Sequence, residues 1–256
     1  MELFFQQLYN TTDAIIVGRF VGKEALAAVG GPTGPLINLL IGFFIGLSSG
    51  AGVTISQFFG AGQEEEVSRA VHTAIAFSIV CGAVIMVIGI PATPYALKAM
   101  GTPDDILHYA VLFMRIYFVG VIPNLVYNMG AGILRAIGDS KRPLYFLIAS
   151  CFTNIILDII FVVYCHMGVM GAALATILSQ LLSAVLVILV LIRTSGAYHL
   201  NLKAVRIDRD MLRRIIRIGF PAGLQSVMYS SSNIIIQSSV NTLGTDTIAA
   251  WTATER

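Results

Sequence analysis

The stretch FTNIILDIIFVVY, Phe152–Tyr164, places an amide and a carboxylate inside a run that is otherwise hydrocarbon. Asn154 and Asp158 are four residues apart, so on a helix they share one face. A charged side chain near the centre of a bilayer costs about 2.5–3.5 kcal/mol on insertion scales. Such residues normally face a cavity and mark an ion or proton path. The stretch therefore predicts a membrane helix with a functional polar face.

The overall composition places this chain in a lipid bilayer. Apolar residues make up 56% of the 256 residues, charged residues only 12%, and the mean hydropathy is +0.82. A soluble domain needs a charged surface, whereas the charges here are confined to short segments between long apolar runs. The net charge of +2 is too small to indicate a nucleic-acid partner. The partner that the composition predicts is the lipid bilayer.

The cysteines and histidines show no pattern for a cofactor or a resident metal. Cys81, Cys151 and Cys165 have no partner at metal-ligand or redox spacing. The four histidines are scattered, with no HExxH motif. We expect no cofactor, and no metal site apart from one for a monovalent cation.

Seven apolar runs of about 20 residues predict an all-α membrane protein with seven transmembrane helices. We expect a first six-helix lobe in residues 1–192, a cytoplasmic connector in residues 193–218 and the first helix of a second lobe in residues 219–256. Part of the connector is expected to lie as an amphipathic helix on the membrane surface. The predicted spans are Leu3–Val21, Pro35–Phe59, Val71–Leu97, Ile106–Leu134, Leu144–Tyr164, Val169–Ile192 and Gly219–Leu243.

Lysine and arginine residues are concentrated in alternate loops. The loops after the second, fourth and sixth runs hold eleven of them, whereas the opposite loops hold only Arg19, Lys23 and Lys98. Basic loops stay cytoplasmic. We therefore predict a multi-pass protein of the plasma (inner) membrane with a cytoplasmic N-terminus.

The sequence contains a short internal repeat. The segments FVGKEALAAV (20–29) and TLGTDTIAAW (242–251) align Gly22 with Gly244 and Glu24 with Asp246. Each segment follows an apolar run, so the seventh helix is predicted to be a second copy of the first. Because six helices separate the two starts, the copies share an orientation, as in the parallel repeats of secondary transporters. On this register the first helix is expected to be clipped at its start and the second lobe to be incomplete.

Of the fourteen carboxylates, only Asp13 and Asp158 lie inside predicted spans. Burial favours the neutral acid, and two neighbouring carboxyl groups compete for one proton. Such a pair can take up a proton or hold a monovalent cation. Polar side chains recur one turn apart on three helices, in the pairs Tyr9 with Asp13, Asn154 with Asp158, and Thr176 with Gln180. The alternative is that Asn154 and Thr176 only join helices through hydrogen bonds.

Five ordered blocks resemble the multidrug and toxic compound extrusion (MATE) family of cation-coupled antiporters. They cover nearly the whole chain and read YNTTDAIIVGRFVGKEALAAVG, GLSSGAGVTISQFFGAGQ, GAGILRAIGDSKRPL, NIILDIIFVVYCHMGVMGAALAT and RIGFPAGLQ. The resemblance implies two six-helix lobes around a central cavity. It also implies export of organic cations or other amphipathic compounds in exchange for protons or sodium ions.

The resemblance also implies site residues. The family's helix-one Asp-x-x-x-Val-Gly setting is matched at Asp13, and its helix-five Asn and Asp are matched at Asn154 and Asp158. A helix-six threonine completes the cation site and corresponds to Thr176, with Tyr9 as a companion one turn before Asp13. If sodium is the coupling ion, the resemblance implies that it binds at Asp13, Asn154, Asp158 and Thr176. We expect the substrate cavity to be lined by Tyr127, Asn128 and Gln180.

Two other functions are compatible with parts of the pattern. A lipid-linked oligosaccharide flippase of the same superfamily would line its cavity with basic residues. An intramembrane aspartyl protease also needs two aspartates, but its Gly-x-Gly-Asp block is missing from the spans, since Gly138 and Asp139 lie in a basic loop. We therefore expect a transporter and not an enzyme. Alternating access needs two lobes, so we expect transport only when a second lobe is supplied in cis.

Overall fold

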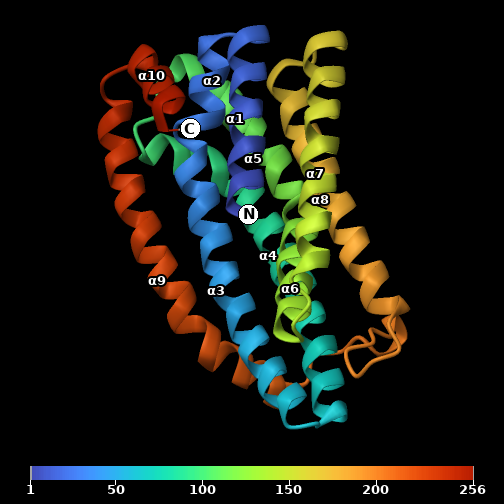
Figure 1. Ribbon diagram of the computed structural model, residues 1–256. Helices are drawn as coiled ribbons and strands as arrows, with labels where there is room; N and C mark the ends of the chain where they lie inside the picture. Colours follow the sequence, from blue (N-terminus) through green and yellow to red (C-terminus); the bar gives the residue numbers. More distant parts are fainter. Residues whose placement is uncertain (1, 256) are drawn as a thin grey trace.

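A computed structural model describes residues 2–255 of the chain, with side chains described for residues 11–252. The chain folds into a bundle of long helices that run between two ends (Figure 1), and no strand occurs in the described residues. The elements are α1 (Glu2–Phe20), α2 (Lys23–Gly30), α3 (Thr33–Gly60), α4 (Glu64–Ala99), α5 (Asp104–Val119), α6 (Val121–Ala136), α7 (Lys141–Asp158), a π-helical segment η1 (Ile159–Tyr164), α8 (Gly168–Arg193), a 3-10 turn η2 (Leu202–Ala204), α9 (Arg209–Asn241) and α10 (Thr245–Glu255).

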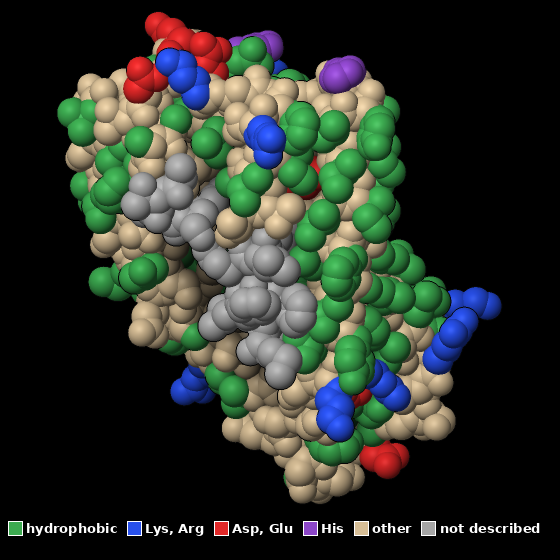
Figure 2. All heavy atoms as spheres, turned by 45° about the horizontal axis from the view of Figure 1, so that its top comes forward, with side chains coloured by type: hydrophobic (Ala, Val, Ile, Leu, Met, Phe, Trp, Pro, Cys, Tyr) green, Lys and Arg blue, Asp and Glu red, His purple; other side chains and the backbone are tan. Residues whose placement is uncertain are grey.

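The helices are long and apolar enough for a membrane protein. Within the described residues, four helical runs could cross a bilayer by length and composition, and the pair α5–α6 is a fifth if it counts as one span. The helices α1 and α9, predicted as the first and seventh spans, are not among these runs. The polar stretches YNTTD and YSSSN lower their hydropathy. The charged side chains gather mainly toward the ends of the bundle, with hydrophobic side chains between them (Figure 2).

The fourth predicted span is not one straight helix. Helices α5 and α6 meet at Gly120 with a bend of 52°. Pro123, in the first turn of α6, has no N–H to donate to the preceding turn, so the α-helical hydrogen-bond ladder is interrupted there. A side chain at Gly120 would also collide with Ile177 of α8. The bend therefore lets α8 pack closely against the break.

The helix that follows the connector begins earlier than the predicted seventh span. The seventh helix begins at Arg209 rather than Gly219, so the basic segment before Gly219 is the start of α9 itself. Asp208 caps this helix, because its carboxylate accepts hydrogen bonds from the backbone N–H groups of Asp210 and Met211. The short α2 helix, a segment that the sequence showed only as part of the repeat, precedes α3.

The two copies of the repeat have the same plan. In each, a long helix is followed by a glycine with positive φ, Gly22 at 122° or Gly244 at 91°, and then by a short helix. Positive φ is easily adopted by glycine alone, which explains why both turns carry it. The short helices α2 and α10 pack against each other, and Lys23 of α2 forms an ion pair of 2.6 Å with Asp246 of α10.

Helix α9 packs along α3 through facing small residues (Figure 1). A side chain added at Gly46 would strike the backbone of Gly223, and one added at Gly50 would strike that of Gly219. Small residues four apart allow two membrane helices to approach this closely.

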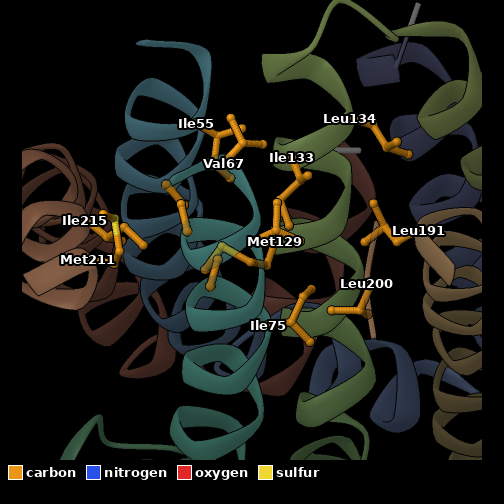
Figure 3. Close-up of a cluster of buried hydrophobic side chains, with 14 of the residues drawn as sticks. Ile55, Val67, Ile75, Met129, Ile133, Leu134, Leu191, Leu200, Met211 and Ile215 are labelled. Atoms are coloured by element: carbon orange, nitrogen blue, oxygen red, sulfur yellow. The ribbon is translucent and has the colours of Figure 1, made fainter. Parts of the chain in front are cut away.

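The largest buried apolar cluster joins the connector to the bundle (Figure 3). It takes side chains from α3, α4, α6, α8 and α9, among them Ile55, Ile75, Ile133 and Leu191. Leu200 of the connector is fully buried in it, and its backbone N–H donates to the carbonyl of Leu191. Leu200 thus anchors the connector to the apolar core of the bundle.

Candidate functional site

Three helices bring the predicted ion-binding residues together. Helix α1 packs against α7 and α8, and it supplies Asp13, while α7 supplies Asn154 and Asp158 and α8 supplies Thr176. All four side chains are buried, with exposures of 6%, 0%, 0% and 2% in that order. The side chain of Tyr9 lies outside the described part of the structure.

The two carboxyl groups lie close enough to interact. Asp13 is the neighbour whose charge acts on Asp158, and no lysine or arginine among the described side chains contributes to the electrostatics of Asp158. Two carboxylates in a low-dielectric site repel each other when both are charged. The pair therefore requires a positive ion or a proton to become stable.

The polar atoms around Asp158 support this requirement. Among the described side chains, neither polar atom of the Asn154 amide has a hydrogen-bond partner, and the Asp158 carboxyl group interacts with that of Asp13. A buried polar group without a partner costs about 1–3 kcal/mol, and more when it is charged. Several such atoms in one place form a site that a cation or protons would complete.

The ligand types at this site fit a proton or a hard monovalent cation. Carboxylate and amide oxygens come from Asp13, Asp158 and Asn154. Thr176 donates its hydroxyl hydrogen to the carbonyl of Ala172 over 2.9 Å, so the lone pairs of its oxygen can still accept or coordinate. Oxygen ligands of this kind suit hard cations rather than soft transition metals. The described residues contain no group of three or more His, Cys, Asp or Glu side chains that could hold a metal ion.

The helix changes its winding at the aspartate. Helix α7 ends at Asp158, and the next six residues, Ile159–Tyr164, are π-helical. The N–H of Cys165 donates to the carbonyl of Ile160 over 2.8 Å, five residues back. Single π turns inside helices frequently occur at functional sites. No sequence pattern predicts this turn, because the segment contains neither glycine nor proline.

A small cavity lies between α6, α7 and α8. Its volume is about 90 Å³, and Tyr127, Asn128 and Gln180, the three residues expected in the substrate cavity, all line it. Its described lining does not include the four residues of the candidate cation site, but α7 and α8 contribute to both places.

Four further polar residues, which were not among the predicted site residues, line the same cavity. Ser150 lies one turn before Asn154, and its hydroxyl donates to the carbonyl of Ser179 over 2.8 Å. Their spacing of three or four residues from predicted site residues could have identified them. The missed residues are Asn124, Ser150, Ser179 and Ser183.

A larger cleft continues from this cavity. Its volume is about 620 Å³, and it shares Tyr127, Asn128 and Leu147 with the small cavity. Serines of α3 and Arg135 of α6 add polar groups to its wall. Helices α3, α6 and α7 thus line a partly polar space that continues into the small cavity.

Comparison with known proteins gives consistent relatives. The family model MatE matches residues 1–160. The chain is 34% identical over 254 residues to "Probable multidrug resistance protein YoeA" of Bacillus subtilis, which covers 96% of this chain and 54% of that protein. It is 23% identical to "Multidrug export protein MepA" of Staphylococcus aureus, over 95% of this chain and 54% of that protein. The chain spans about half the length of the curated relatives that it matches.

Solved structures show the same similarity. One described as the inward-facing conformation of a multidrug resistance MATE family transporter of the MOP superfamily matches with a TM-score of 0.90 at 29% identity, covering 98% of this chain and 57% of that one. A structure described as the outward-facing conformation matches with a TM-score of 0.82 at 26% identity, covering 98% and 62%. The prediction of an all-helical membrane protein that resembles this transporter family is confirmed. The chain belongs to the MatE family of multidrug efflux transporters.

Proposed function

We propose that this chain supplies the ion-coupling lobe of a cation-coupled antiporter that exports amphipathic organic compounds from the cytoplasm. The observation that carries the proposal is the buried pair of Asp13 and Asp158 beside the unpartnered amide of Asn154. Two carboxyl groups buried within reach of each other are costly for a membrane fold, and such residues normally mark an ion or proton path. The coupling ion is a proton or sodium.

In the proposed mechanism, an ion that enters from outside neutralises the carboxylate pair. Neutralisation removes the repulsion between Asp13 and Asp158, so α1 can settle closer to α7. This movement changes the wall of the adjacent cavity and weakens its hold on the exported compound. Loss of the ion to the cytoplasm resets the pair. The ion therefore shifts the equilibrium because it binds more tightly to the arrangement in which α1 lies closer to α7.

The substrate is proposed to occupy the space lined by Tyr127, Asn128 and Gln180. One tyrosine ring, three amides and three serine hydroxyls in an otherwise apolar wall suit varied amphipathic molecules. The relatives named as multidrug resistance or export proteins support this substrate class. A flippase is not favoured, because no lysine or arginine lines the small cavity among its described residues.

The decisive experiment replaces Asp158 with Asn in a protein that also carries the second lobe, so that it has the full length of the relatives. We expect ion-driven efflux of a cationic dye to fall by at least about tenfold, because an interaction with a charged group contributes roughly 1.5–3 kcal/mol. The matched control is Asp104→Asn, which makes the same chemical change at an exposed position. Membrane levels of both variants are measured alongside transport.

Retention of normal dye efflux by Asp158→Asn would rule out the proposed coupling role. Equal losses in both variants would indicate a general effect of removing a carboxylate. Efflux by proteoliposomes under a pH gradient or a sodium gradient, each imposed separately, identifies the coupling ion.

We also propose that transport requires a second lobe in cis. Alternating access moves two lobes around a shared site, and the relatives are about twice as long as the part covered here. Cells that express this chain alone are expected to show no dye efflux above background.

We also propose that the N-terminus of the first lobe lies on the cytoplasmic side of the inner membrane. Labelling of single cysteines introduced into the loops tests this orientation.

A further inference from the structure

A separate pocket lies at the connector end of the bundle. Its volume is about 370 Å³, and its wall is built by the start of α4 and the segment that leads into α9. Three cationic side chains, Arg69, Lys203 and Arg206, line it together with one carboxylate, Asp208. Ser68 and Thr73 add hydroxyl groups. The lining thus carries a net positive charge.

The walls of this pocket are fixed by hydrogen bonds. The Nε2 atom of His72 accepts from the backbone N–H of Asn201 over 3.0 Å, while its Nδ1 lies 2.7 Å from the carbonyl of Ser68. The hydroxyl oxygen of Thr73 accepts from the backbone N–H of Asp208 over 3.1 Å. These bonds attach both ends of the basic segment to α4, so the pocket is preformed.

The three cations are not equivalent. Arg69 is held by Glu66 at 2.8 Å and by Asp208 at 2.7 Å. The hydrogen bond from Arg69 is the main cause that keeps the pKa of the Asp208 carboxyl below its usual range, so this carboxylate remains charged and occupied by Arg69. Lys203 and Arg206 are exposed and form no ion pair with any described side chain. They can therefore bind an external anion.

Apolar side chains flank these two cations. Leu202 is 62% exposed and Ile207 is 39% exposed, and each is adjacent in sequence to one of the free cations. A basic segment with exposed apolar neighbours at the end of a membrane bundle is suited to the interface, where the apolar groups enter the acyl region and the charges meet headgroups.

The pocket at the opposite end of the bundle has the reverse charge. Its volume is about 420 Å³, and its lining carries three carboxylates, Glu24, Asp105 and Asp246, against the single cation Lys23. Lys23 is itself paired with Asp246. A phosphate would be repelled there and attracted at the connector end. The positively charged pocket thus lies at the end of the bundle whose basic loops predict the cytoplasmic side.

We propose that the pocket of Arg69, Lys203 and Arg206 binds the phosphodiester headgroup of an anionic phospholipid from the cytoplasmic leaflet. The headgroup phosphate is held by Lys203 and Arg206, with the Ser68 hydroxyl as an additional donor. The acyl chains lie against Leu202, Ile207 and the neighbouring bundle surface. This site is distinct from the carboxylate pair, and it does not depend on which ion or compound is transported.

The test is native mass spectrometry of the detergent-purified protein with dioleoyl phosphatidylglycerol, compared with dioleoyl phosphatidylcholine. The double variant Lys203→Gln, Arg206→Gln is expected to bind phosphatidylglycerol about 30-fold more weakly, at about fivefold for each lost cation. The control is Arg213→Gln, Arg217→Gln, which removes the same charge from exposed positions of α9 outside the pocket. We expect the control to change the affinity by less than about twofold.

Three outcomes would overturn the proposal: equal binding in the parent and the pocket variant, equal weakening in the pocket and control variants, or displacement of the lipid by equimolar inorganic phosphate. The first means no site, the second a diffuse attraction, and the third a site for free phosphate. If the double variant fails to fold, the single variant Lys203→Glu at an exposed position serves instead. It is expected to weaken phosphatidylglycerol binding by more than fivefold, while thermal unfolding stays unchanged.

Discussion

The two copies of the repeat, α1–α2 and α9–α10, share a backbone plan but differ in chemistry. When the register that places Gly22 on Gly244 is extended backwards, Asp13 of the first copy corresponds to Ile235 of the second. Asp13 is 6% exposed, whereas Ile235 is 69% exposed. The same helix-turn-helix therefore forms with a carboxylate or with an apolar side chain at this position. The fold does not need the acid, which points to function as the reason for it.

The copies also differ in what they contact. Helix α1 packs on α7 and α8, where Asn154, Asp158 and Thr176 provide polar atoms. Helix α9 packs on α3 through glycines, and the interface excludes side chains altogether at Gly46 and Gly223. One contact is a site for an ion, and the other is a close backbone contact that aligns two helices.

The largest expected effect comes from removing the acid of the first copy. We expect Asp13→Asn to reduce ion-driven efflux by at least about tenfold, because the pair loses one of its two charges and with it the Coulomb attraction for the coupling ion. Efflux of a cationic dye from proteoliposomes measures the loss. The matched control is Ile235→Asn, which puts the same amide at the corresponding position of the second copy and is expected to change efflux by less than about threefold once membrane levels are equal.

A double variant sharpens this test. Asp13→Ile with Ile235→Asp moves the carboxylate from one copy to the other and conserves net charge. We expect it to remain inactive, because Asn154, Asp158 and Thr176 stay with the first copy. Recovery of coupled efflux would mean that a carboxylate can act from either copy, and the assignment of the site to one lobe would fail.

The next effect tests the second copy's packing. Gly46→Ala adds a methyl group where it would strike the backbone of Gly223. Overpacking of a close contact costs about 1–3 kcal/mol, so the thermal unfolding temperature in detergent should fall. Gly52→Ala is the control on the same helix, since a methyl group there meets only the carbonyl of Gly132 at 3.6 Å. It should be neutral or stabilising by up to about 1 kcal/mol, because alanine is the better helix former. Equal effects of both changes would show that the α3–α9 contact tolerates separation.

Sequence and structure agree most closely where hydrophobicity alone decides. The long apolar runs predict the helices, and the cost of a buried charge predicts that Asp13 and Asp158 lie inside the bundle and not in lipid. The positive φ of Gly22 and Gly244 gives the repeat a physical basis at both turns. These features depend on local composition or on one residue type.

Other features depend on contacts that a sequence does not specify. Glycine and proline occur in many membrane helices, so Gly120 and Pro123 predict neither the site nor the size of the bend between α5 and α6. The glycines of α3 would suit any close partner helix, and α9 could be identified only in three dimensions. The π turn after Asp158 lacks a residue signature. The basic residues after Asp208 suit both a surface helix and the first turns of a longer one.

The smallest effect concerns the link between the two copies. Lys23 and Asp246 join α2 to α10 at 2.6 Å, but their side chains are 66% and 80% exposed. An exposed pair of this kind contributes little to stability, and salt screens it. In a double-mutant cycle of Lys23→Ala and Asp246→Ala, we expect the two changes to be nearly additive at low salt and fully additive near about 1 M salt. Thermal unfolding at low and high salt provides the measurement. A strong coupling that salt does not affect would mean that the copies are joined through a desolvated contact, and the apolar packing of α2 on α10 would no longer be the main connection between them.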